Sequence, residues 1–225
     1  MHSEFPKLVS YTRFIELMKV AAIPLMLFMK GLSKQHTDNY FADSTPMKVC
    51  HIKREKSHKV FKGLAQKSKG TMGWFFGFKL HIVINHLGEI MNFTITTSTT
   101  DDRKPLVKLM SGLKGWLFAD KGYIGEELIQ KLKQQAIELF TKVRKNMKKR
   151  PMTSAQRQML KKRGLVETVI DQLKNICQIE HTRHRSPINA LVNIFSGLVA
   201  YALKPRKPSI SQKILPWPSL LLISN

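Results

Sequence analysis

Three carboxylates stand out in a chain that has few acidic side chains. The 225-residue sequence contains 15 Asp and Glu against 38 Lys and Arg. Asp43 follows the apolar run 40–42, and Asp120 follows the apolar run 116–119, so each Asp is predicted to end a short strand. Site residues of α/β folds gather at strand ends, although roughly half of such residues taken singly only cap a helix or form a turn. Two of them in one chain favour a shared site.

Glu167 is the third carboxylate, and it lies on a predicted helix over 154–175. It follows an acid-free stretch, 140–166, that holds ten Lys and Arg. Helical spacing places Arg163, Glu167, Asp171 and Lys174 on one polar stripe. Taken alone, such a stripe is an ordinary solvated set of ion pairs worth a few tenths of a kcal/mol each. Glu167 therefore needs the two Asp residues to give it a chemical role.

Two or three carboxylates are sufficient to hold divalent ions for phosphodiester chemistry. Two ions roughly 3.5–4 Å apart activate the attacking oxygen and stabilise the leaving oxygen of an in-line displacement. Mg²⁺ prefers hard oxygen ligands, with several contributed by water and phosphate, and Mn²⁺ is an alternative. We expect Asp43 and Asp120 to hold the metals and Glu167 to complete the second site.

The charge balance predicts a polyanionic partner. The formal net charge is +23 and the isoelectric point is about 10.2, which is typical of nucleic-acid binding. A ribosomal-type or chromatin-type protein that binds nucleic acid without catalysing a reaction is the alternative that fits an equally basic composition. Two cysteines without a CxxC motif fit a reducing compartment. The apolar runs are too short or too polar to span a membrane, so a cytoplasmic protein is expected.

Periodicity predicts an α/β fold with a mixed sheet covered by helices. We expect a helical N-terminal region over 1–37, a catalytic domain over 38–204, and a Pro-rich, poorly ordered tail over 205–225. The stretch 48–69 is interpreted as an extended basic connection with little structure of its own. The remaining elements predicted for the domain are a strand over 73–84, a turn at 86–89, a strand over 90–97, a helix over 102–113, strands over 116–119 and 137–143, a helix over 126–135 between them, and a last helix from 186–187 onward.

Four segments resemble bacterial insertion-sequence transposases of the DDE type, and the nearest group is the insertion-sequence 982 family. The resemblance covers residues 40–208, and its motifs occur in the right order. It implies an RNase H-like fold with the triad on Asp43, Asp120 and Glu167. Arg163 and Lys174 match basic positions of related groups, whereas Leu160 replaces a Tyr found in some relatives. The segments that carry the resemblance are Phe41-Ala42-Asp43-Ser44-Thr45-Pro46, Gly73 to His81, Ala119-Asp120-Lys121-Gly122-Tyr123 and Glu180 to Pro187.

The resemblance implies a transposase that cuts DNA by water attack and joins ends by attack of a 3′-hydroxyl. Its partners would be the element ends and target DNA, with a homodimer on DNA and a bacterial, nucleoid-associated location as further expectations. Only 42 residues precede Asp43, so a copy shortened at the N-terminus is expected. The alternatives are an RNase H-like nuclease without strand transfer and an inactive DNA-binding remnant.

Three other sets of residues could also contribute to a site. Trp74, Phe76 and Phe78 alternate on one strand face and are interpreted as core rather than as a base-stacking platform. Asp101 and Asp102 are interpreted first as helix caps, and a role for Asp102 beside the metals is the weaker alternative. Cys177, His181 and His184 have zinc-like spacing but lack an obvious fourth ligand.

Basic residues near the motifs are the candidates for DNA contacts. The predicted DNA-binding residues are Lys79, His81, Lys121, Lys145, Lys148, Lys149, Arg150, Arg163, Lys174, Arg183 and Arg185.

Overall fold

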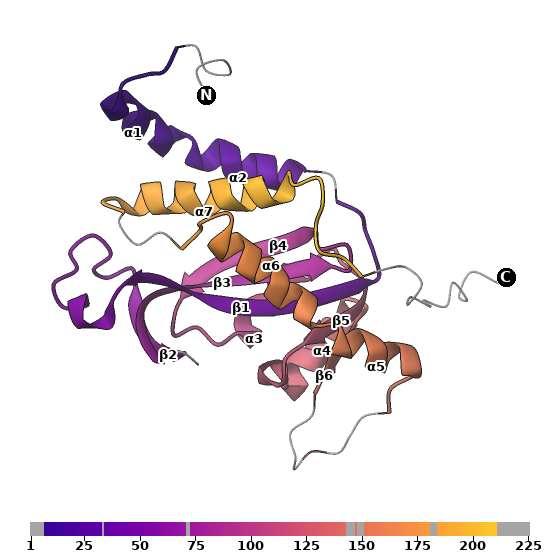
Figure 1. Cartoon of the computed structure of the whole chain (residues 1–225). Helices are drawn as coiled ribbons and strands as arrows, with labels where there is room; N and C mark the ends of the chain where they lie inside the picture. The colour runs from indigo at the N-terminus through magenta and orange to yellow at the C-terminus, as the bar shows by residue number, and fades with distance from the viewer. Residues whose placement is uncertain are drawn as a thin grey trace.

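The computed structural model describes residues 7–32, 34–70, 73–142, 147, 151–180 and 184–210 (Figure 1). Its helices and strands follow the predicted order closely. In chain order they are α1 (Tyr11–Val20), α2 (Ala22–Gly31), β1 (Asn39–Cys50), η1 (Ile52–Arg54), β2 (Gln66–Gly70), β3 (Gly73–Asn85), β4 (Ile90–Thr97), α3 (Arg103–Leu109), β5 (Gly115–Ala119), η2 (Lys121–Tyr123), α4 (Glu126–Gln134), β6 (Ile137–Thr141), α5 (Ser154–Lys161), α6 (Gly164–Asn175) and α7 (Pro187–Ala202).

The six strands form one mixed sheet whose central strand carries the first candidate carboxylate. Along one edge, β3 pairs antiparallel with β1. Along its other edge, β3 pairs antiparallel with β2 in its first part and with β4 in its second part. β1 then pairs in parallel with β5, and β5 with β6. An antiparallel half joined through β1 to a parallel half, with helices on both faces, is the RNase H-like fold that the sequence predicted. The hairpin turn between β3 and β4 is also where it was expected.

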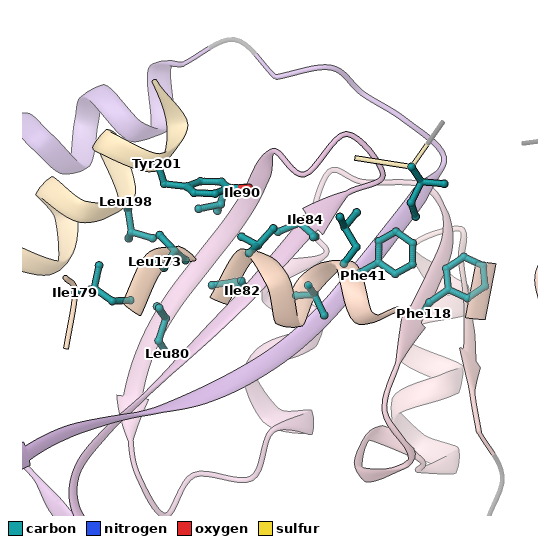
Figure 2. Packing of buried hydrophobic residues seen from close by; sticks show 14 of the residues in the cluster. Phe41, Leu80, Ile82, Ile84, Ile90, Phe118, Leu173, Ile179, Leu198 and Tyr201 are labelled. Carbon is teal, nitrogen blue, oxygen red and sulfur yellow. The ribbon is translucent and has the colours of Figure 1, made fainter. Parts of the chain in front are cut away.

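Each face of the sheet is covered by its own helices because side chains alternate between the faces. Figure 2 shows Leu80, Ile82 and Ile84 of β3 packing beneath α6 and α7, close to Leu173 and Leu198. This cluster continues across β1, β5 and β6 through stacked aromatic rings. On the opposite face, α3 and α4 cover Tyr40, Ala42 and Val83 in a second cluster (Figure 1). The two layers hold β1 and β5 rigidly in register.

The chain segments on either side of the predicted catalytic domain also contact it. α2 lies alongside α7 (Figure 1), and Met29 of α2 is buried in the first cluster. Ile210 is buried too, and its N–H donates to the carbonyl of His86 at 2.9 Å. The expected boundaries at residues 37 and 204 stay predictions. Within the described ranges, no helix combines the length and apolar character needed to cross a membrane.

Two local predictions were wrong in the first half of the chain. β1 does not end at Asp43 but continues to Cys50. Pro46 is tolerated inside it because β5 pairs only with 39–41, which leaves that edge of β1 without a strand neighbour. The connection over 48–69 also has structure of its own, because it contains η1 and β2. Its apolar members form a small cluster: Val49, Phe61 and Ala65, with Phe76 of β3.

The long helix predicted over 154–175 is in fact two helices. α5 begins with a capping box at Thr153 and ends at Lys161. A tight turn follows, in which the N–H groups of Leu165 and Val166 donate to carbonyls three residues earlier. Gly164 at this point has low helix propensity, so the break costs little. α6 therefore starts its own axis, with Arg163 at its N-cap.

Candidate active site

The parallel register of β1 and β5 brings Asp43 and Asp120 to the same level of the sheet. Phe41 lies opposite Phe118, and each aspartate is two residues further along its own strand direction. Residues two apart on a strand share a face, so both carboxylates belong to the face on which the Phe41 and Phe118 rings stack at 5.6 Å. β5 ends at Ala119. Asp120 thus leaves the sheet beside Asp43.

α6 carries Arg163 and Glu167 over this point. The Arg163 guanidinium lies 3.5 Å from Oδ2 of Asp43, and it also donates to the carboxylate of Glu167 one helical turn away. Arg163 is 17% exposed, whereas the Glu167 side chain is 56% exposed. One cation therefore bridges a carboxylate of the sheet and a carboxylate of the helix.

Asp43 is an unfavourable place for a negative charge. The pKa of its carboxyl is raised to about 6, and burial is the largest cause. The N–H of Ser44, which donates to Oδ1 at 2.8 Å, and the Arg163 guanidinium lower that pKa, while the charges of Glu167 and Asp120 raise it further. Asp43 is therefore close enough to Glu167 and Asp120 to be repelled by both.

The donor chemistry fits hard divalent cations. Carboxylate oxygens are the ligands that Mg²⁺ prefers, and a cation between Asp43 and Asp120 would relieve the repulsion that raises the Asp43 pKa. Among the described residues, no group of three His, Cys, Asp or Glu is already close enough together to hold a metal. Arg163 supplies the positive charge at this position instead.

A partly buried polar network that the sequence did not reveal lies behind Asp43. The Ser44 hydroxyl donates to Oδ1 of Asp102 at 2.9 Å, and the Lys79 ammonium donates to the same oxygen at 2.9 Å. Burial raises the pKa of the Tyr123 phenol, and the charges of Asp102 and Asp43 raise it further. Ser44 therefore links Asp43 on one face of β1 to Asp102 on the other.

A family model of the transposase DDE domain matches residues 33–187. The chain belongs to the transposase DDE domain family. The match contains Asp43, Asp120 and Glu167, together with the strands and the helix that carry them. A search of curated protein sequences finds no match for this chain.

Solved structures of low sequence identity resemble this DDE transposase domain. The piggyBac transposase in a synaptic complex with hairpin DNA has a TM-score of 0.48 and 11% identity, over 75% of this chain and 46% of that one. The catalytic core of BIV integrase has a TM-score of 0.43 and 11% identity, over 76% and 90% of the two chains. A simian T-cell lymphotropic virus intasome bound to a PP2A regulatory subunit has a TM-score of 0.39 and 13% identity, over 81% and 60%.

Two of the predicted DNA contacts of this DDE domain are buried or partly buried in the structure. His81 is 2% exposed, and burial lowers the pKa of its imidazole to about 4, so the ring is uncharged at neutral pH. Lys79 is 18% exposed and is engaged by Asp102 and by the carbonyl of Thr100. Asp102 thus binds Lys79 instead of capping α3, and Asp101 accepts the backbone N–H of Arg103 in its place.

The other predicted contacts divide into exposed residues, engaged residues and residues outside the described ranges. Lys121 and Arg185 are exposed, whereas Arg163 is engaged by Asp43 and Glu167. The predictions that lie outside the described residues are Lys145, Lys148, Lys149, Arg150 and Arg183, and His181 of the zinc hypothesis lies there as well.

Lys174 stabilises the domain from inside. Its ammonium donates to the carbonyl of Pro46 at 2.7 Å and lies 2.9 Å from the carboxylate of Glu180. Glu180 in turn accepts the backbone N–H of Lys48 at 2.9 Å. These contacts fasten the end of α6 to β1, so Lys174 has a structural role in the fold, and its predicted DNA contact stays a prediction.

We expect Lys174→Ala to destabilise the protein rather than to change the salt dependence of DNA binding. The variant leaves the Glu180 carboxylate and the Pro46 carbonyl without their donor, a loss of about 1–3 kcal/mol in the free energy of unfolding. Urea denaturation measures this change, and Lys121→Ala, at an exposed position, is the matched control with almost no change. A variant of unchanged stability that loses one unit of salt slope would assign Lys174 to DNA.

Proposed function

We propose that this domain is the catalytic domain of an insertion-element transposase, of the insertion-sequence 982 type, which cleaves and joins DNA with divalent metal ions. The observation that carries the proposal is the arrangement of Asp43 and Asp120 at one level of two parallel strands, under a helix that brings Glu167. Membership of the transposase DDE family supports the same reading of the three carboxylates.

The chain's own groups would act on the metals and on the reacting phosphate in distinct ways. Asp43 and Asp120 would hold Mg²⁺ between the strands, and Glu167 would complete the second site from α6. When bound, the ions activate the attacking oxygen and stabilise the leaving oxygen. Asp43 binds only after it loses its proton, which is retained up to a pH of about 6. Arg163 has to release both carboxylates, and its guanidinium then becomes available to a phosphate.

DNA is the partner that the charge distribution favours. The net charge of +23 matches a polyanion. The eight Lys and Arg of 48–69 are all exposed, and the only acid in that stretch is Glu55. Phosphate contacts of this kind position a duplex without reading its sequence. Water as the attacking group would give cleavage, and a 3′-hydroxyl would give strand transfer.

The experiment that tests the proposal follows cleavage and joining separately. The full chain is incubated with supercoiled plasmid and with labelled duplexes from the DNA that flanks its coding frame, in Mg²⁺ or in EDTA. We expect nicking and joined products only in Mg²⁺. Cleavage without joined products would instead establish a nuclease without strand transfer, and salt-sensitive binding without cleavage would establish a DNA-binding remnant.

Glu167→Gln should lower the nicking rate by roughly 100-fold or more, because the amide keeps the shape of the side chain but removes a metal-binding charge. Asp171→Asn is the matched control, since it removes one exposed acid from the same helix, one turn beyond Glu167. Equal rates for the Glu167 variant and the parent protein would remove Glu167 from the proposed triad.

A further inference from the structure

Trp74 is exposed at the beginning of β3, where the sequence predicted a core residue. It shares a strand face with Phe76 and Phe78, yet 56% of it is exposed, whereas Phe76 is 6% exposed. Phe76 packs in the cluster with Phe61. Between Gly73 and Phe75, β3 pairs with the short strand β2, and its pairing with β1 ends at Phe76. A single exposed aromatic residue is common on proteins. Its surroundings decide whether this one binds a ligand.

Two lysines of β2 accompany the indole on the same face. Lys69 lies directly opposite Trp74 in the antiparallel register, and Lys67 lies opposite Phe76. The ammonium of Lys67 is 5.0 Å from the centroid of the Trp74 ring, within the range of a cation–π contact. Both lysines are exposed. The Lys67 ammonium lies over the ring, and it is also 3.9 Å from a carboxylate oxygen of Glu55. The ring therefore keeps a partly open apolar surface with positive charge beside it.

This site is held in place by contacts that do not involve the ring. The Ser98 hydroxyl donates to the carbonyl of Gln66 at 2.7 Å, which ties β2 to the end of β4. His58 packs against the rings of Phe61 and Phe76 at centroid distances of 5.6 and 6.1 Å. The indole is thus presented on a supported strand pair, and little order has to be gained when a planar ligand binds.

We infer that Trp74, Lys67 and Lys69 form a binding site for an unpaired nucleotide of DNA, with the base stacked on the indole and the phosphates on the lysines. Stacking on aromatic side chains beside cations is how proteins hold single-stranded nucleic acid without reading its sequence. Bases inside a duplex cannot offer their faces in this way. The inference rests on the proposed function for the identity of the polymer, and it adds a second contact point to it.

The position of the ring sets which part of a bound strand it reaches. Asp43 lies opposite Ile82 on β3, and Trp74 is eight positions earlier on the same face of that strand. At about 3.3 Å per residue this separation is about 26 Å, or about eight nucleotides of a strand with B-form rise. An unpaired stretch at that distance from the reacting phosphate reaches the indole, whereas an unpaired base at the phosphate itself does not.

Binding of labelled oligonucleotides to the full-length protein tests the inference. In EDTA, Trp74→Ala should weaken binding of a 20-nucleotide oligothymidine by about 5- to 100-fold and leave binding of a fully paired 20-base-pair duplex within about twofold. Trp74→Phe should recover most of the loss. Tyr11→Ala removes an aromatic side chain of α1 that is 80% exposed, and it is the matched control with no effect. Circular dichroism and thermal unfolding verify that each variant is folded.

Two outcomes would overturn the site. One is an equal loss for single strand and duplex in Trp74→Ala, and the other is unchanged affinity for both. Because the measurement uses EDTA, it does not depend on cleavage. Absent nicking in Mg²⁺ would count against the proposed function alone, while intact nicking with unchanged oligothymidine binding in Trp74→Ala would count against this site alone.

Discussion

Asp120→Asn is expected to abolish metal-dependent nicking while leaving DNA binding intact. Asp120 directly follows β5 and lies beside Asp43, so the amide would remove one of the two charges through which this part of the sheet would hold a metal. We expect the nicking rate to fall by roughly 1000-fold or more, because metal catalysis contributes several kcal/mol to the transition state. Affinity for DNA should stay the same or rise slightly, since a negative charge facing phosphates is lost.

Plasmid nicking in Mg²⁺ and gel-shift titration in EDTA measure the two halves of this prediction on the same preparations. Asp171→Asn is the control for the loss of an acidic residue, because Asp171 lies exposed on α6. A nicking rate in Asp120→Asn equal to that of the parent would reject the carboxylate pair as the catalytic centre. A loss of nicking together with a large loss of duplex binding would indicate a folding defect instead of a chemical one.

The sequence predicted the architecture because its signals are local. Short apolar runs before Asp43 and Asp120 mark two strands, and helical spacing marks the helix with Glu167. The order of these elements is sufficient to indicate a mixed sheet with helices on both faces. The level at which Asp43 meets Asp120 depends on the pairing of Phe41 with Phe118. That register is set by side-chain packing across the sheet, which the spacing of one strand does not encode.

Some of the predicted DNA contacts are residues whose surroundings are assembled from distant parts of the chain. Lys79, His81 and Lys174 are basic residues in a basic protein, and the sequence alone favours DNA contacts for them. In the structure, Asp102 approaches Lys79 and His81 from the start of α3, and the carbonyl of Pro46 on β1 accepts a hydrogen bond from Lys174. These partners are far from the basic residues in the sequence, so the pattern does not show which basic residues are already engaged inside the protein.

Trp74 was misplaced for a related reason. Its alternation with Phe76 and Phe78 correctly predicts a shared strand face, but alternation gives no information on how far the covering helices extend along it. The first cluster includes Leu80, Ile82 and Ile84 but not Trp74. The length of a helix over a sheet is a tertiary property, and it separates a core tryptophan from an exposed one.

The raised pKa of Asp43 means that the ionised carboxylate destabilises the metal-free fold. In the unfolded chain the carboxyl ionises near its ordinary pKa of 3.8, and in the folded protein it ionises at about 6. Between these values the folded state holds more protons, so stability falls as the pH rises. Below a pH of about 3.8 this penalty is absent, and above a pH of about 6 it is fully developed. The attraction of Arg163 is already included in this balance, so it does not cancel the penalty.

Asp43→Asn should therefore be more stable than the parent protein at pH 8 by about 1–3 kcal/mol, with the difference shrinking toward zero at pH 4. The amide carries no charge at either pH, and Arg163 keeps Glu167 as a partner. Urea denaturation of both proteins at pH 4, 6 and 8 in EDTA measures the difference. Added Mg²⁺ should then stabilise the parent at pH 8 but not the variant, because only the ionised carboxylate offers the charge that holds the ion. A stability difference that is the same at all three pH values would show that ionisation of Asp43 does not destabilise the folded protein.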